Sequence, residues 1–141
     1  MAIIKRETDY ALRALAKLAR AGECLPVSVL AEEEDIPEVF LRKIMQELKA
    51  AGIVESRQGP FGGYLLASPP EEVSVLDVLE AVQGPLVMNE CFSESQICSR
   101  VDFCPVRKRL AELQVELNAE LADFNLGSIV GQLHEQEAAS R

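Results

Sequence analysis

The sequence lacks several features that common enzyme classes require. It has a single histidine, His134, and none of its four cysteines forms a C-x-x-C pair. A thiol redox enzyme therefore lacks its usual motif. No nucleophile can be assigned to the histidine, which lies close to the end of the chain. We expect that the protein is not an enzyme.

Signals for membranes and for secretion are also missing. No apolar run approaches the ~20 residues that a membrane-spanning helix needs. The first residues contain no apolar stretch of the signal-peptide kind. We therefore expect a cytoplasmic protein without a membrane partner, whose thiols are kept reduced.

Positive charge is scarce overall but unevenly distributed. The net charge of -9 argues at first against nucleic acid, because phosphate binding needs Lys and Arg. Residues 1–66 carry nine basic against ten acidic side chains, whereas residues 67–141 carry five against thirteen. The N-terminal half therefore remains compatible with DNA. With 141 residues, 48% of them hydrophobic, the chain can form one domain with a core, or a small domain plus an oligomerisation element.

What the chain does contain is a group of three cysteines, Cys91, Cys98 and Cys104, in a polar segment. The segment lies between two predicted helices and spans about twenty residues, where compact domains usually use ~4–6. Thiolates are preferred ligands of zinc, copper(I) and iron-sulfur clusters. Grouped thiols in a long polar loop therefore indicate a metal or cluster site.

Other interpretations of these thiols remain open. Buried packing is disfavoured by the polar neighbours, and a disulfide would leave one cysteine over. Structural zinc prefers ligand pairs two to four residues apart, whereas the spacers here are six and five residues. An iron-sulfur cluster is the favoured interpretation. The fourth cysteine, Cys24, lies far from the others and is expected to take no part.

The N-terminal half predicts short helices joined by tight turns. Thr8 and Ser28 are expected to cap the first two helices, and Pro37 is expected to open a third that runs to about Ala51. Apolar residues recur along one face of the third helix, at Leu41, Ile44, Met45 and Leu48. The opposite face carries Val39, Arg42, Lys43, Gln46 and Ala50. This is the arrangement of a helix-turn-helix with a DNA-recognition helix, although an ordinary helical hairpin would show the same pattern.

Two short strands are predicted next, over residues 53–57 and 64–67, joined by a glycine-rich tip. A hairpin directly after a recognition helix is typical of a wing. Arg57 is placed to reach a narrow minor groove, and Gly59 would let the backbone approach phosphates. Glycines at a tip also satisfy ordinary hairpin geometry.

The C-terminal half predicts a helix capped by Ser74 and then a long helix that begins at Pro105. Its apolar residues recur in steps of four and three, at Val106, Leu110, Leu113, Leu117, Leu121 and Phe124. A narrow seam of this kind predicts a homodimer. Asn125 and Gly127 are expected to break the helix, with a short helix after them.

We therefore expect a mainly α fold with a small β-hairpin. Residues 1–85 would form a winged helix-turn-helix DNA-binding domain, and residues 86–104 a cysteine-rich cluster-binding loop. Residues 105–135 would form the dimerisation helix and a short C-terminal helix, and residues 136–141 a frayed tail.

Three sequence runs and the cysteines together resemble one known family. The runs are residues 7–13 (ETDYALR), residues 40–54 and the wing RQGPFGGYLL at residues 57–66. With the cysteine triad they resemble the Rrf (Rrf-two) family of winged-helix iron-sulfur transcription regulators, which includes IscR-like and NsrR-like members. The resemblance implies a homodimer that binds a double-stranded DNA operator. It also places three residues of these runs, Tyr10, Phe40 and Pro60, among the DNA-binding residues.

The resemblance further implies that Cys91, Cys98 and Cys104 hold a 4Fe-4S or 2Fe-2S cluster that senses redox state, nitric oxide or iron-sulfur status. In IscR-like members a histidine three residues after the third cysteine completes the site. Arg107 stands there in this chain and cannot be a ligand. In NsrR-like members an aspartate from the other subunit takes the role, and Asp9 stands at the matching place. The alternative is a winged-helix regulator or protein-interaction module with structural zinc or no metal.

Overall fold

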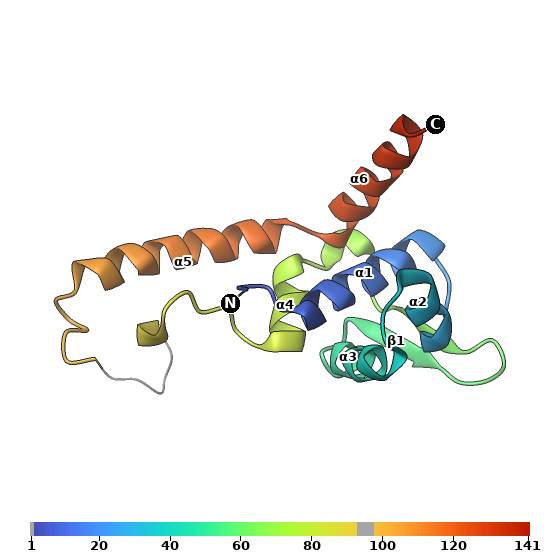
Figure 1. Cartoon of the computed structure of the whole chain (residues 1–141), viewed down its shortest axis with the longest axis horizontal. Helices are drawn as coiled ribbons and strands as arrows, with labels where there is room; N and C mark the ends of the chain where they lie inside the picture. The colour runs from blue at the N-terminus through green and yellow to red at the C-terminus, as the bar shows by residue number, and fades with distance from the viewer. Residues whose placement is uncertain (1, 93–97) are drawn as a thin grey trace.

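The computed structural model of the chain describes residues 2–92 and 98–141. Its elements follow in the order α1 (Arg6–Ala21), α2 (Val27–Glu34), α3 (Glu38–Ala50), β1 (Val54–Arg57), β2 (Gly63–Leu66), η1 (Pro70–Glu72), α4 (Val75–Gln83), η2 (Glu90–Phe92), α5 (Pro105–Asp123) and α6 (Leu126–Ala139), where η denotes a 3-10 turn. Figure 1 shows α1 to α4 and the hairpin gathered in one body, from which α5 extends away. The predicted mainly α fold with a small β-hairpin is confirmed.

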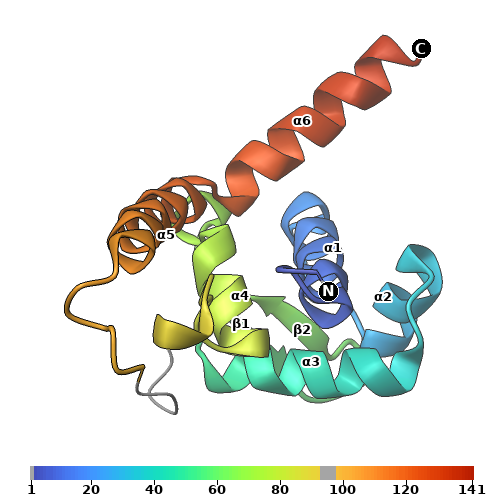
Figure 2. The same cartoon turned by 60° about the vertical axis from the view of Figure 1, so that its left-hand side comes forward.

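The hydrophobic core lies where α1 crosses above α3, with α4 and α2 on either side (Figure 2). α1 contributes small side chains such as Ala11 and Ala14, both fully buried, which let the two helices approach closely. α3 contributes its predicted stripe, of which no member is more than 2% exposed: Leu41, Ile44, Met45 and Leu48. Each fully buried Leu or Ile stabilises the fold by about 1.5–3 kcal/mol. This burial fixes the rotation of α3 and turns its opposite face outward.

The predicted cap of the first helix is wrong. Thr8 lies inside α1 and is fully buried, and the residue that precedes the helix is Lys5. The side chain of Gln83, at the end of α4, takes over the capping. Its Oε1 accepts hydrogen bonds from the Thr8 hydroxyl at 2.6 Å and from the Lys5 backbone N–H at 3.0 Å. Its Nε2 donates to the Ile3 carbonyl at 2.9 Å. We call this arrangement the Gln83 clamp; it joins the start of α1 to the end of α4.

Two other predicted helix starts shift, and one is confirmed. α2 begins directly after Pro26, so Ser28 lies inside it and caps nothing. Pro37 precedes α3 rather than occupying its first position. Ser74 does cap α4: its Oγ accepts from the Asp77 backbone N–H at 3.0 Å, and the Asp77 carboxylate accepts from the Ser74 N–H at 3.1 Å. Such reciprocal bonds satisfy two backbone donors that the helix leaves free.

The predicted hairpin is present, and its strands are antiparallel with Arg57 opposite Gly63. Its second strand also pairs with Leu25, since Leu25 and Tyr64 exchange backbone hydrogen bonds of 2.9 and 2.8 Å. Gly63 has φ +145°, and a Cβ there would lie 2.2 Å from the Leu25 carbonyl oxygen. Only glycine therefore allows the hairpin to sit this close to the link between α1 and α2.

α5 is anchored to the rest of the molecule at its C-terminal end. The Phe124 carbonyl accepts from the Val75 N–H at 2.7 Å, and the Leu126 N–H donates to the Val73 carbonyl at 2.9 Å. Asn125 caps α6 through the Ser128 N–H, so the predicted break lies here. Gly127, however, lies within α6 and does not break it.

The predicted frayed tail is partly wrong, because α6 continues to Ala139. Arg20 of α1 forms an ion pair with Glu137 of α6, a contact across 117 positions of the sequence. Among the helices of the two described stretches, none is both long and apolar enough to span a membrane.

Candidate nucleic-acid interface and thiol site

The outward face of α3 carries the side chains that the sequence predicts for DNA contact. Val39 is 79% exposed and Phe40 is 58% exposed, although both are large and apolar. Three predicted polar side chains of the same helix are also exposed: Arg42, Lys43 and Gln46. The structure thus brings all five onto the surface of one helix, because the opposite stripe is buried. Such a face offers hydrogen-bond donors and acceptors for base edges and an apolar surface for thymine methyl groups.

The hairpin forms a wing beside α3 whose tip projects from the body (Figure 1). Arg57 is exposed at the end of β1, and Gly59 has φ +104° in the tip that follows. Pro60 is exposed, and Phe61 beside it is 92% exposed. Sequence reasoning missed Phe61 as a functional residue. The signal was available, since an aromatic residue flanked by proline and glycine at a hairpin tip has no core to enter.

Two basic side chains of α1, Arg13 and Lys17, contact the acidic end of α2. Lys17 forms an ion pair with Glu33 at 2.6 Å, and Arg13 donates to the Glu34 backbone carbonyl. The Arg13 guanidinium also lies 5.6 Å from the centre of the Tyr10 ring, which is half-buried. Among the predicted DNA residues, Tyr10 is therefore the one placed against the core rather than fully on the surface. The contacts of Lys17 and Arg13 offset part of the negative charge of α2.

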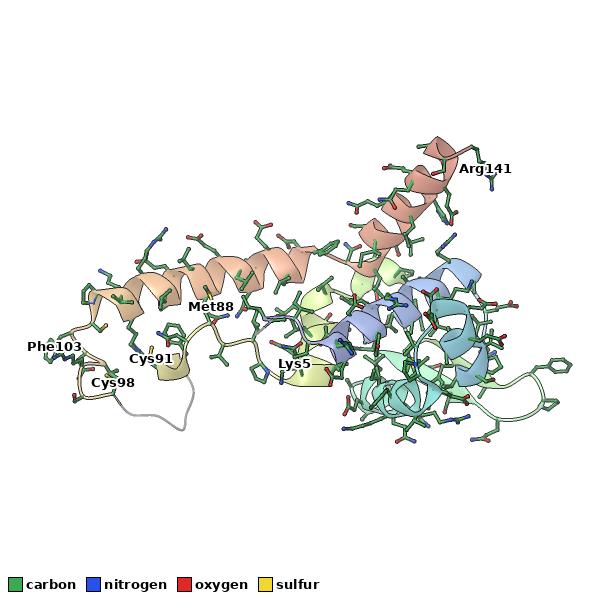
Figure 3. The ribbon with its side chains drawn as sticks, in the orientation of Figure 1. Lys5, Met88, Cys91, Cys98, Phe103 and Arg141 are labelled. Carbon is green, nitrogen blue, oxygen red and sulfur yellow. The ribbon has the colours of Figure 1, made fainter. Side chains whose placement is uncertain are left out.

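The three grouped cysteines lie at the end of the molecule remote from the wing, where Cys91 and Cys98 are visible in Figure 3. Cys91 belongs to η2 and is half-buried, Cys98 is exposed, and Cys104 is half-buried directly before α5. Residues 93–97, part of the predicted cysteine-rich loop, lie outside the described residues. Cys24 is elsewhere, next to the pairing of Leu25 with the hairpin.

The described residues do not form a finished ligand set. No three Cys, His, Asp or Glu side chains in residues 2–92 and 98–141 lie close enough together to hold a metal ion. The predicted fourth ligand, Asp9, is exposed in the first turn of α1 and lies 3.7 Å from the Arg13 guanidinium. One chain alone therefore does not bring Asp9 to the three cysteines.

Two observations nevertheless show that an iron-sulfur cluster suits this end of the molecule. The first is the donor set itself, because its three thiols are the ligands that such clusters prefer. Cys104 directly precedes α5, and its Sγ accepts a hydrogen bond from the Arg107 backbone N–H at 3.5 Å. The second observation is an orphaned donor: Arg107 Nε is buried and has no hydrogen-bond partner among the described residues. A sulfur-rich anionic group would satisfy it.

Known proteins resemble this chain over most of its length. The Rrf2 family model, described as an iron-dependent transcriptional regulator, matches residues 4–132. The protein aau3 of Rhizobium meliloti is 36% identical over 118 residues, covering 82% of this chain and 75% of the relative. The protein rrf2 of Nitratidesulfovibrio vulgaris is 31% identical over 123 residues, covering 86% and 82%.

Solved structures agree on the fold. CymR, the global cysteine regulator of B. subtilis, superposes with a TM-score of 0.76 at 22% identity, covering 94% of this chain and 98% of CymR. IscR of T. potens superposes with a TM-score of 0.75 at 21% identity, covering 94% and 89%. The predicted winged-helix fold is thereby confirmed.

Proposed function

Because the chain belongs to the Rrf2 family of transcriptional regulators, we propose that it acts as a homodimer whose affinity for an operator is controlled by an iron-sulfur cluster. As a member of this family it is a DNA-binding regulator of transcription and not an enzyme. The signal in this proposal is redox state, nitric oxide or iron-sulfur status. The observation that carries the proposal is the group of three thiols, one of which, Cys104, accepts the backbone N–H of Arg107, the residue with the orphaned Nε.

In this proposal residues 1–85 read the DNA. Arg42, Lys43 and Gln46 hydrogen-bond to base edges in the major groove, and Val39 contacts a thymine methyl group. Arg57 and the wing tip reach the adjacent minor groove. The exposure of these side chains supports the assignment. Phosphate contacts by the same basic residues make the affinity fall steeply with salt.

The surface of α5 supports the proposed homodimer, in which residues 105–135 form the dimerisation region. None of the 19 residues of α5 is buried. Along its predicted seam, Val106 is 62% exposed, and four leucines are only half-buried: Leu110, Leu113, Leu117 and Leu121. A helix with an uncovered apolar side gains most by packing against a second copy of itself. A two-fold dimer also presents two α3 helices to two half-sites of an operator.

Cys91, Cys98 and Cys104 would hold the cluster, with Asp9 of the second subunit as fourth ligand. When bound, the cluster supplies a centre that reacts with oxidants and nitric oxide. A carboxylate is a harder ligand than a thiolate and binds such a centre more weakly. The Asp9 link is therefore the labile one. Asp9 is exposed in the first turn of α1, and it would exchange its ion pair with Arg13 for the cluster of a partner subunit.

The Gln83 clamp provides a route from this site to the DNA face. It binds the start of α1, which carries Asp9, to the end of α4, from which the cysteine-bearing segment departs. α1 in turn packs directly on the buried stripe of α3. A displacement of Asp9 would therefore be transmitted to the recognition helix. A change in the spacing of two recognition helices lowers operator affinity.

The test compares iron and sulfide content with operator binding. Protein purified without oxygen is expected to contain both elements and to bind its operator more tightly than apo or nitric-oxide-treated protein, by about 1–3 kcal/mol. Asp9→Ala should keep a cluster and lose most of that difference. Glu7→Ala, which removes another exposed carboxylate from the same helical turn, should retain it. Three superimposable binding curves at one salt concentration would contradict the sensor and leave the DNA-binding assignment intact.

A second candidate is a winged-helix regulator or interaction module that holds zinc or no metal. It is favoured by the absence, within the described residues, of three converging ligand side chains. Zinc without sulfide in freshly purified protein, or neither metal nor sulfide, would favour this candidate.

A further inference from the structure

One buried polar atom of the described chain has no explanation in the fold. Arg107 Nε is buried, and no acceptor lies within hydrogen-bond reach among the described residues. An unsatisfied N–H at a charged group is costly, so native structures keep few of them, and those that remain commonly mark a functional group or an unseen partner.

The position of the side chain suggests what that partner is. The Arg107 guanidinium lies over the ring of Phe92, 5.5 Å from its centre, and Phe92 directly follows Cys91. The backbone N–H of the same arginine donates to Cys104 Sγ. One residue therefore contacts both the segment that carries the first thiol and the thiol of the third.

A hollow of about 860 Å³ borders Cys104, Arg107 and Lys108 at the first turns of α5. Three other basic residues lie near the thiols, and all of them are exposed: Arg100, Lys108 and Arg109. Arg109 is already paired with Glu112 at 2.9 Å. Arg107 is thus distinguished from these three by burial and by its unsatisfied donor.

We propose that Arg107 is a donor to the iron-sulfur cluster without being one of its ligands. Its Nε–H bonds to a cysteine thiolate or to a sulfide of the cluster, and its positive charge offsets their negative charge. This inference rests on the proposed function. Hydrogen bonds to sulfur and a nearby cation favour the more negative, reduced form of a cluster and hold the cluster more firmly. The ring of Phe92 keeps the guanidinium oriented.

The experiment compares Arg107→Met with Arg109→Met in the full-length protein after anaerobic reconstitution with iron and sulfide. Both substitutions remove one positive charge from the first turns of α5. Arg107→Met should lose its cluster to a chelator about 10-fold faster than the wild type. Its reduction potential, followed by absorbance during titration with a reductant, should shift to more negative values. Arg109→Met should match the wild type in both measurements.

Equal changes in the two variants would overturn the proposal, because they would reflect net charge alone. A lower melting temperature of apo Arg107→Met with an unchanged potential would overturn it too, since the role would then be structural. If the methionine variant does not fold, Arg107→Lys decides. Lysine keeps the charge but has no Nε–H, so a loss rate and potential equal to those of the wild type would contradict the proposal.

The proposed function and this inference fail in different ways. A wild-type protein that takes up no iron and sulfide would overturn the proposed function and, with it, this inference. A loaded wild type with an indistinguishable Arg107→Met variant would overturn the inference alone.

Discussion

The guanidinium of Arg42 is ion-paired with the carboxylate of Glu38, one turn earlier on α3. Both side chains are largely exposed, at 61% and 42%, so the pair contributes no more than about 0.5 kcal/mol. DNA can therefore displace Glu38 from Arg42 at little cost. Until it does, Glu38 holds a negative charge at the surface where phosphates arrive.

Glu38→Gln should consequently tighten binding to operator and to unrelated duplexes alike, by about 2–5-fold, or ~0.4–1 kcal/mol. The reason is the removal of charge repulsion, which acts on every sequence. Fluorescence anisotropy with both duplexes at one salt concentration measures the effect. Glu116→Gln removes an exposed carboxylate from α5 and should leave both affinities unchanged. Unchanged or weaker binding by Glu38→Gln would place α3 away from the DNA.

Arg42→Ala should weaken DNA binding and should also reduce the preference of the protein for its operator sequence. We expect a loss of ~1–3 kcal/mol with the operator and relaxed specificity at one base pair. Selection from random duplexes with cluster-loaded protein reports both. A wild-type selection that enriches no palindrome would show that the assignment of the recognition helix is wrong.

Phe61→Ala tests the wing tip. Because the ring is 92% exposed, its removal should change the free energy of unfolding by less than about 0.5 kcal/mol. Operator affinity should nevertheless fall several-fold, since an apolar side chain on a wing can pack against sugars or enter a base step of the minor groove. Gln58→Ala, at an exposed position of the same wing, provides the comparison. Identical operator affinities for wild type and Phe61→Ala would exclude this contact.

The Gln83 clamp predicts non-additive stability changes. Gln83→Leu leaves the buried Thr8 hydroxyl without its acceptor and should destabilise the fold by about 1–3 kcal/mol. Thr8→Val in that background should recover part of the loss, because a methyl group replaces the stranded hydroxyl. Urea unfolding of the two single variants and the double variant gives the coupling. Purely additive losses would mean that the Thr8 and Gln83 side chains do not stabilise each other.

The visible absorbance of reconstituted protein distinguishes the three proposed ligand cysteines from Cys24. Cys91→Ala, Cys98→Ala and Cys104→Ala should each abolish the visible absorbance of reconstituted protein, because each removes a thiolate ligand. Cys24→Ala should keep the absorbance, since Cys24 lies by the hairpin. Loss of absorbance in the Cys24 variant equal to that in the other three would reassign the ligands.

Local sequence patterns predicted the structure correctly where it depends on residues close together in the chain. The spacing of Leu41 and Ile44 identified the buried side of α3, and Ser74 identified the start of α4. The glycines of the wing could be assigned to a hairpin tip for the same reason. The sequence did not predict that Leu25 approaches the hairpin closely enough to make glycine necessary at position 63.

Contacts between distant parts of the chain account for what the sequence could not predict. Thr8 has a side chain that commonly caps helices. Its hydroxyl instead donates a hydrogen bond to Gln83, 75 positions later, and the residue is buried within α1. The last turns of α6 gain an ion pair with Arg20 that no local pattern contains. Arg107 was identifiable only as a residue that cannot be a ligand. Its orphaned Nε and its contact with Phe92 needed the three-dimensional structure.

The anchoring of α5 at one end makes the helix a lever. Its 19 residues span about 28 Å at 1.5 Å per residue, with the pivot at Phe124 hydrogen-bonded to Val75 and Cys104 at the far tip. A swing of about 10° about that pivot moves the tip by about 5 Å, which is a full helical pitch. Conversely, a displacement of the thiols by a few ångströms would rotate α5 only slightly about the pivot. The hydrogen bonds of the pivot are made by Val73 and by Val75, the first residue of α4, so in the proposed sensor a displacement of the tip would act on the start of α4 as a rotation.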